Sequence, residues 1–321
     1  MEIEEELPAS LVAPLDVRDV YGNLLIEEGD DLTPDVLGDI GCCGKFTSSC
    51  RLSLKGSLVR RDMEELLQQG VYHVMFPPER RAQVLALYDD LRVLPVLFEE
   101  FEFMRSRDRY VYEHTLRTAA MTATLAMDLY GEEKAQLIGY TALTHDLGMV
   151  RLPDEILKQD IGDDPRKRMV LYGHTIMGYV LLTYYTGSPD FSSCRVALEH
   201  HERANRSGYP RGVELKDRVI ELIALADTFD ALISERPFRK KAVDTRGAFD
   251  FLLNRSKQGY FSPSAVSLLV VYNRQSRASG GDLMISDEVR SSFHHDDRYV
   301  DWSVWKLNAP PFCPMKKPGR Q

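Results

Sequence analysis

The sequence predicts a mainly α-helical protein with a small mixed α/β module at its N-terminus. From about residue 81 to residue 273 the pattern is helical, and one stretch with helical spacing contains Leu116, Ala119, Ala120, Ala123 and Met127. Before this region, short apolar stretches alternate with turn signals. We therefore expect an N-terminal regulatory or sensory module over residues 1–85, a helical metal-binding domain over 86–275 and a C-terminal arm over 276–321.

The elements of the N-terminal module follow from its turn residues. Residues 24–26 are apolar and come after Gly22-Asn23, which is typical of a short strand after a turn. A helix is expected over 61–69 and ends near Gly70. Residues 71–76 are then expected to form a strand, which Pro77-Pro78 ends.

Start and stop signals divide the helical region. Gly131 ends the helix that contains Leu116, and Gly148 ends the next helix, which carries His145. Asp164-Pro165 predicts a helix start, with an N-cap and a proline at the first helical position. A further helix is expected over 217–234.

The bulk properties limit the function classes. The 321 residues are 44% hydrophobic, which is ample for a core, and the net charge is −9. An acidic chain does not have the basic footprint that duplex nucleic acid requires. No apolar run reaches the length of a membrane span. The acidic start does not resemble a secretory signal, and the five cysteines indicate neither a zinc finger nor a disulfide framework, so we expect a cytoplasmic protein.

Five of the eight histidines and two aspartates form an ordered set along the helical region. They are His114, His145-Asp146, His174, His200-His201 and Asp227. Three of them, His145, His174 and Asp227, belong to helical stripes that are otherwise apolar or small, such as the stripe of Ile138, Thr141, Ala142 and His145. Burial of an unpaired, ionised carboxylate costs on the order of several kcal/mol, unless the group takes up a proton. A cation shared by these side chains removes that cost.

A single histidine of this set, taken alone, is more typical of a hydrogen-bonded core residue than of a metal ligand. The two doublets and their partners on separate helices favour a metal site. Imidazole and carboxylate together suit Mn, Fe or Zn. Five imidazoles and two carboxylates exceed one tetrahedral set and predict two metals.

The order of the surrounding motifs is also specific. It runs through His114-Thr115, His145-Asp146-Leu147-Gly148, Pro153-Asp154-Glu155-Ile156-Leu157, His174 with Gly178, His200-His201-Glu202-Arg203, Gly208-Tyr209-Pro210, Ala226-Asp227-Thr228-Phe229-Asp230-Ala231-Leu232 and Arg236-Pro237. In this order the chain resembles the HD-GYP branch of the HD phosphohydrolase superfamily, over about residues 100 to 265. The resemblance implies an all-helical HD-type bundle and hydrolysis of cyclic di-GMP to the linear dinucleotide or to GMP. The resemblance is also consistent with the sensory module expected at the N-terminus of this chain.

The resemblance implies a role for each motif. One metal takes His114, His145, Asp146 and Asp227, and the second takes His174, His200 and His201, with Asp146 bridging both. Asp146 and Arg236 are the implied catalytic residues, with the Arg236 guanidinium steadying the phosphate. Two divalent ions are expected, with iron favoured and manganese possible. The implied partners are cyclic di-GMP or a related phosphate ester and, at Gly208-Tyr209-Pro210, diguanylate cyclase (GGDEF) domains. That stretch, by itself, indicates only a turn after a helix.

The chain departs from the family pattern around the same pocket. Met149 stands where a lysine is common, Phe238 replaces a tyrosine, and Asn205-Arg206 replaces Asp-Gly. Tyr110 stands where some members have a glutamate that helps to hold a third metal, so two metals are expected here.

Three functions remain open. The first is a binuclear phosphodiesterase, of full or of weak activity. The second is a catalytically degenerate member that binds a nucleotide or a GGDEF domain. The third is hydrolysis of another phosphate ester, because a fold does not fix a substrate.

Asp230 is expected either to orient a ligand histidine or to pair with Arg203 or Arg236 at a helix surface.

Overall fold

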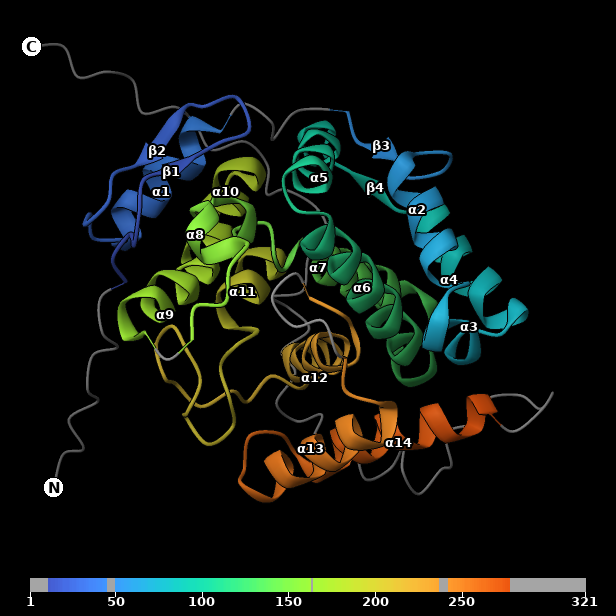
Figure 1. Ribbon diagram of the computed structural model, residues 1–321. Helices are drawn as coiled ribbons and strands as arrows, with labels where there is room; N and C mark the ends of the chain where they lie inside the picture. Colours follow the sequence, from blue (N-terminus) through green and yellow to red (C-terminus); the bar gives the residue numbers. More distant parts are fainter. Residues whose placement is uncertain (1–10, 45–49, 163, 237–241, 278–321) are drawn as a thin grey trace, which may run out of the picture.

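The structure is a computed structural model, shown in Figure 1, and it describes residues 11–44, 50–162, 164–236 and 242–277. Helices dominate these ranges, and short strand pairs accompany them near the N-terminus. The predicted fold class, a helical bundle after a small mixed α/β module, is confirmed. Residues 237–241 and 278–321 lie outside the described ranges. The expectations for Pro237, Phe238 and most of the C-terminal arm fall there.

The N-terminal part combines two antiparallel strand pairs with four helices. Its elements are β1 (Val17–Arg18), β2 (Leu24–Ile26), α1 (Pro34–Cys43), β3 (Leu52–Ser53), α2 (Leu58–Leu66), α3 (Gly70–Met75), α4 (Pro78–Asp90) and β4 (Arg92–Val93). Strand β1 pairs with β2, and β3 pairs with β4. The strand expected over 24–26 is confirmed, and the helix expected over 61–69 is present as α2.

The strand predicted over 71–76 is wrong, because this segment is the helix α3. Tyr72 and Met75 are buried whereas His73 and Val74 are exposed, which is the spacing of a helix face and not of a strand. The Phe76 amide donates to the Tyr72 carbonyl in a helical bond of 2.8 Å. The β-branched and aromatic residues of the segment favour a strand locally, and packing against the helical domain overrides that preference.

The helical domain follows without a break. Its elements are α5 (Pro95–Arg107), α6 (Arg109–Tyr130), α7 (Glu132–Thr144), the 3₁₀ helix η1 (Met149–Arg151), α8 (Asp154–Leu157), α9 (Pro165–Tyr172), α10 (His174–Thr186), α11 (Ser192–Glu199), α12 (Arg218–Ile233), α13 (Thr245–Lys257) and α14 (Pro263–Arg277). Helix α6 is buried over most of its length and packs against α5, α7 and α12. Three of the predicted helix boundaries are confirmed: Gly131 ends α6, and Asp164 and Asp217 cap α9 and α12. The end predicted at Gly148 is wrong, because α7 ends at Thr144, and His145 caps it.

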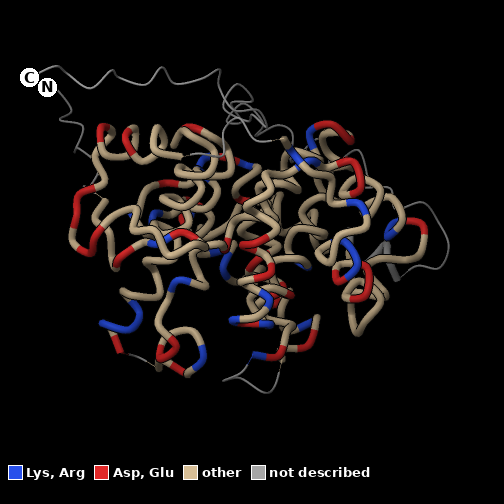
Figure 2. The backbone as a smooth tube through the Cα atoms, turned by 90° about the horizontal axis from the view of Figure 1, so that it is seen from above, with Lys and Arg blue, Asp and Glu red and all other residues tan. Residues whose placement is uncertain are grey.

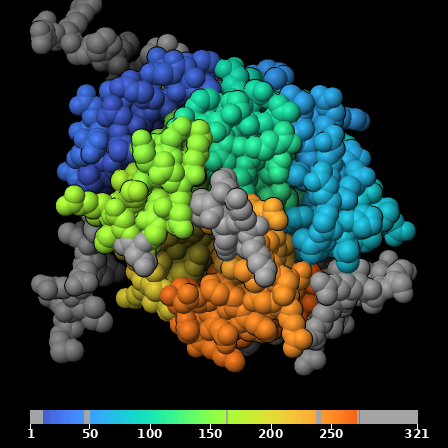
Figure 3. Space-filling model, in the orientation of Figure 1, coloured from blue at the N-terminus to red at the C-terminus, as the bar shows by residue number. Residues whose placement is uncertain are grey.

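The N-terminal part does not form a separate body. Helix α1 packs on α10, whereas α2 packs on α6 and α4 packs on α7. Figure 3 shows the N-terminal segments, dark and light blue, on two sides of the helical domain. The boundary expected at residue 85 lies inside α4, and β4 pairs back to β3 beyond it. The chain therefore has no linker at that point, and the three-part division remains a prediction.

Charged residues of both signs occur along the described chain. Figure 2 shows Lys and Arg interspersed with Asp and Glu along the described backbone. Within the described ranges, no helix combines the length and the apolar character that crossing a bilayer requires.

Candidate metal centre

Asp146 lies at the centre of the candidate site, directly after α7. The turn that carries it is held close to α10 by Gly148, where an added Cβ would lie 1.9 Å from the His174 carbonyl oxygen. Only glycine permits this approach. As a result, Asp146 Oδ1 lies 3.5 Å from the Nε2 atoms of both His174 and His200, and its Oδ2 lies 3.5 Å from His145 Nε2.

Three of the histidines are oriented by backbone carbonyls three or four residues before them. The Nδ1–H of His145 donates to the Ala142 carbonyl at 2.7 Å, and that of His174 donates to the Leu171 carbonyl at 2.7 Å. The Nδ1–H of His200 points at two carbonyls of α11, each at 3.0 Å. Because a carbonyl only accepts, each ring keeps its lone pair on Nε2, on the side of Asp146.

His114 reaches the same centre from α6 and is oriented by a carboxylate. Its Nδ1 donates to Asp230 Oδ2 at 2.7 Å, and its Nε2 lies 2.9 Å from Asp227 Oδ1 and 3.8 Å from Asp146 Oδ2. Asp230 is fully buried on α12. Of the two roles left open for Asp230, orientation of a candidate ligand histidine is therefore the one present. Arg203 instead donates to the backbone carbonyl of His200.

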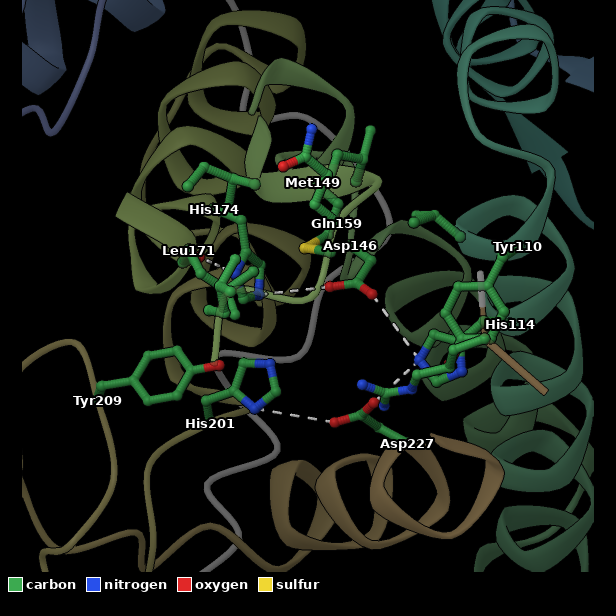
Figure 4. A pocket seen from close by; sticks show the side chains of 15 residues that line it. Tyr110, His114, Asp146, Met149, Gln159, Leu171, His174, His201, Tyr209 and Asp227 are labelled. Atoms are coloured by element: carbon green, nitrogen blue, oxygen red, sulfur yellow. Dashed lines mark hydrogen bonds and ion pairs between the residues drawn. The ribbon is translucent and has the colours of Figure 1, made fainter. Parts of the chain in front are cut away.

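His201 completes the set and is held by aromatic stacking. Its ring stacks on Tyr209 with centroids 4.6 Å apart, and Tyr209 stacks in turn on Tyr172 at 3.8 Å. Gly208 makes this possible, because an added Cβ there would lie 2.3 Å from the His201 carbonyl oxygen. His201 Nδ1 lies 3.8 Å from Asp227 Oδ2. Figure 4 shows Tyr209 beside His201 at the edge of the pocket.

The donor atoms fit metal binding. Two groups have ligand atoms within 4.8 Å of one another, namely Asp146, His174, His200 and His201, and His114, His145 and Asp146. Asp146 belongs to both groups. Its Oδ1 and the Nε2 of His145 are buried without a hydrogen-bond partner among the described residues. Such orphaned polar atoms cost free energy unless a cation accepts their lone pairs.

The protonation states of His174, His201 and Asp227 suit a metal. Burial lowers the pKa of His174 to about 4 and that of His201 well below its ordinary value, so both imidazoles are neutral near pH 7. Burial acts to raise the pKa of Asp227, but the hydrogen bond and charge of His114 and the charge of His145 together outweigh it, and the pKa is lowered. Neutral imidazoles and ionised carboxylates are the forms that bind metal.

A small pocket of about 160 Å³ opens over these donors (Figure 4). Tyr110 stacks on His114 in this pocket, and the Arg236 guanidinium lies over the Tyr110 ring at 5.6 Å from its centroid. The wall on the side of η1 and α9 is largely apolar, with Met149, Ile156, Leu157, Ile161 and Leu171.

The structure thus brings together all seven candidate metal ligands and places Arg236 in the same pocket. It places Tyr209 in the pocket lining, with Gly208 and Pro210 half-buried beside it. Two residues behind the site were missed by the sequence reasoning. Arg117 and Tyr72 both contact Asp230, and the only local signal was the position of Arg117 three residues after His114 on the same helix.

Comparisons with known proteins agree with this geometry. Residues 111–232, which include all seven candidate ligands, match the HD domain family. A cyclic di-GMP phosphodiesterase of Thermotoga maritima is 33% identical over 159 residues, which is 48% of this chain and 41% of that protein. A 3'3'-cGAMP-specific phosphodiesterase 1 of Vibrio cholerae is 30% identical over 137 residues, covering 42% of this chain and 31% of that protein.

The chain thus spans about two fifths of the length of the Thermotoga relative. Among solved structures, Bd1817, an HDG"Y"P protein from Bdellovibrio bacteriovorus, superposes with a TM-score of 0.43 at 17% identity, covering 82% of this chain and 95% of that one. A similarity at this level adds nothing to the assignment. From the domain match, the sequence relatives and the motif order, residues 111–232 of this chain form an HD domain of the HD-GYP type.

Proposed function

We propose that this protein is a binuclear metal-dependent phosphodiesterase that hydrolyses cyclic di-GMP to the linear dinucleotide or to GMP. The observation that carries the proposal is the convergence on Asp146 of imidazole donors from α6, from α10 and from the ends of α7 and α11, with Asp227 of α12 beside His114 and His201. The names of the curated relatives support a cyclic dinucleotide as the class of substrate.

Each metal has its own set of donors in this proposal. The first is held by His114, His145, Asp146 and Asp227, and the second by His174, His200 and His201, with Asp146 shared. Iron is the favoured metal and manganese the alternative, since this mixture of nitrogen and oxygen donors suits both. Bound divalent ions of this kind lower the pKa of water and neutralise phosphate oxygens.

The remaining pocket residues orient the substrate. Arg236, held over Tyr110, offers a planar guanidinium to a phosphate oxygen. The apolar wall formed by Met149, Leu157 and their neighbours excludes water, which strengthens electrostatic interactions inside the pocket. The Met149 side chain has no charge. We therefore infer that Arg236 binds the phosphate without a lysine at position 149.

Chromatography of product formation tests the proposal. Full-length protein is purified without oxygen, loaded with Fe²⁺ or Mn²⁺, and incubated with cyclic di-GMP, 3'3'-cGAMP and a generic phosphodiester. We expect linear dinucleotide or GMP from the loaded protein and none from the Asp146→Ala variant. Absence of any product from protein that is shown to contain both metals contradicts the proposal.

A second function is favoured by one observation, the methionine at position 149. Its side chain lines the pocket where the family resemblance places a phosphate-facing lysine. In this alternative the protein binds the nucleotide, or a GGDEF domain at Gly208-Tyr209-Pro210, without turnover. Calorimetry with cyclic di-GMP and with an isolated GGDEF domain distinguishes the two, since binding without product supports the second function.

A further inference from the structure

The carboxylate that orients His114 is itself held by several donors. Asp230 Oδ2 accepts from His114 Nδ1 at 2.7 Å and from the Ser234 hydroxyl at 3.2 Å. Asp230 Oδ1 accepts from Arg117 Nε at 2.9 Å. Asp230 has no exposed surface, so each of these donors replaces a water that the carboxylate would otherwise bind.

A further donor comes from outside the matched HD domain. The hydroxyl of Tyr72, on α3, makes a short hydrogen bond to Asp230 Oδ1. Tyr72 is 158 residues away from Asp230 in the sequence and is only 7% exposed. The Arg117 guanidinium lies over its ring at 5.4 Å from the centroid, which fixes the ring as well as the hydroxyl.

The protonation states make the direction of this bond unambiguous. Burial, and then the charge of Asp230, raise the pKa of Tyr72 well above its ordinary value, so the phenol keeps its proton. Burial alone acts to raise the pKa of Asp230, but Arg117 and the bond from His114 hold it well below its usual range. The tyrosine therefore donates and the carboxylate accepts.

We propose that Tyr72 is a positioning residue of the metal centre, which ties α3 of the N-terminal part to His114 through Asp230. This inference rests on the proposed function, because His114 is one of the proposed ligands of the first metal. A shift of α3 withdraws a donor from Asp230 and loosens the orientation of the His114 ring. The N-terminal part thereby sets the affinity of the first metal.

The chain offers a matched control for the packing role of a buried tyrosine. Tyr88, on α4, is also buried in the N-terminal part, and its hydroxyl donates to the Gly139 carbonyl of α7 at 3.2 Å. Both tyrosines thus send one hydroxyl into the helical domain. The hydroxyl of Tyr88 contacts a backbone carbonyl of α7 and no side chain of the candidate site, whereas that of Tyr72 contacts the carboxylate that accepts from His114.

Calorimetric titration of metal-free, full-length protein with Mn²⁺ alone tests the inference. We expect two binding events in the wild type, and in Tyr72→Phe a roughly tenfold weaker affinity for one of them, as is typical when a partner behind a metal ligand is removed. Tyr88→Phe is expected to lower thermal stability without changing either affinity. Asp230→Asn should weaken the same event as Tyr72→Phe.

A double-mutant cycle separates positioning from general stability. If Tyr72 acts through Asp230, adding Tyr72→Phe to Asp230→Asn changes the Mn²⁺ affinity little further, because the carboxylate through which Tyr72 acts has already been removed. Equal Mn²⁺ affinities for Tyr72→Phe and Tyr88→Phe, or full additivity in the cycle, overturn the inference while leaving the metal centre intact. A wild type that binds no Mn²⁺ or Fe²⁺ overturns the proposed function, and this inference with it.

Discussion

The Nε2 atoms of His174 and His200 lie 3.4 Å apart and face each other. Because both rings commit their Nδ1–H to backbone carbonyls, both Nε2 atoms carry lone pairs. Two lone pairs at this distance repel unless a cation lies among them. Asp146 Oδ1, 3.5 Å from each ring, adds a third donor to the same space.

Removing one of these donors should weaken both metal binding and the stability that metal supplies. His200→Ala is expected to lose most of the increase in melting temperature on addition of Mn²⁺, an increase that corresponds to about 2.7 kcal/mol when metal is present at about 100 times its Kd. Differential scanning calorimetry with and without metal measures this. His73→Ala, at an exposed position on α3, is the control and should keep the full increase. Equal metal responses in the two variants contradict the assignment of His200.

The stability of the metal-free protein should fall on mild acidification. His174 has a pKa of about 4 in the fold against an ordinary value of 6.5, so between these values the unfolded chain binds a proton that the folded chain does not. The free energy of unfolding therefore decreases as the pH falls from 6.5 to 4, by on the order of 3 kcal/mol for this group. Urea unfolding at several pH values in the presence of chelator measures it. His174→Gln should flatten the dependence, and an unchanged slope in that variant refutes the explanation.

Gly148→Ala should disrupt the centre through backbone contact. The added Cβ meets the His174 carbonyl, so we expect a loss of about 3 kcal/mol or more in unfolding free energy and reduced metal content. Gly38→Ala is a matched control in α1, where a Cβ meets nothing within 4 Å and the helix should gain up to about 1 kcal/mol. Denaturant unfolding and elemental analysis compare the two. A well-folded, metal-replete Gly148→Ala protein contradicts the close approach.

Arg206→Gly should stabilise the protein. Arg206 has a φ of +63°, a conformation that costs a side-chain-bearing residue about 1 kcal/mol or more and that glycine adopts freely. The family pattern that the chain resembles has glycine at this position. We expect a gain of up to about 1 kcal/mol in denaturant unfolding. Asp250→Gly, at an exposed position inside α13, should lose a similar amount, and a loss in both variants contradicts the prediction.

Met149→Lys should raise turnover if the missing cation limits the rate. A charge that stabilises the transition state is typically worth about 10²-fold or more, so we expect at least a tenfold increase in kcat/KM for cyclic di-GMP. Ile161→Lys places the same charge on another part of the pocket wall and serves as the control. Equal changes in both variants indicate general attraction of an anion and not a restored contact.

The sequence predicted the candidate ligands because their signals are local. Doublets such as His145-Asp146 and helix starts such as Asp164-Pro165 depend on residues that are neighbours in the chain, and Asp164 caps α9 as expected. Segment 71–76 was predicted wrongly because its composition favours a strand, whereas the burial that makes it a helix comes from distant parts of the chain.

The contacts of Asp230 behind the candidate ligands could not be predicted, because they also come from distant parts of the chain. Tyr72 reaches Asp230 across 158 residues, and nothing in the local pattern of α3 marks it as a partner of α12. The choice between the two roles of Asp230 also depended on the packing of α6 against α12, which places His114 and Arg117 beside it.

The metal content of freshly purified protein tests the central claim most directly. Full-length protein prepared without oxygen and loaded with Fe²⁺ or Mn²⁺ is analysed for metal per chain. The account predicts about two ions per chain in the wild type and a marked loss of both in Asp146→Ala, because Asp146 belongs to both donor groups. Protein that remains free of metal after loading with either ion, or an Asp146→Ala variant that keeps both, contradicts it.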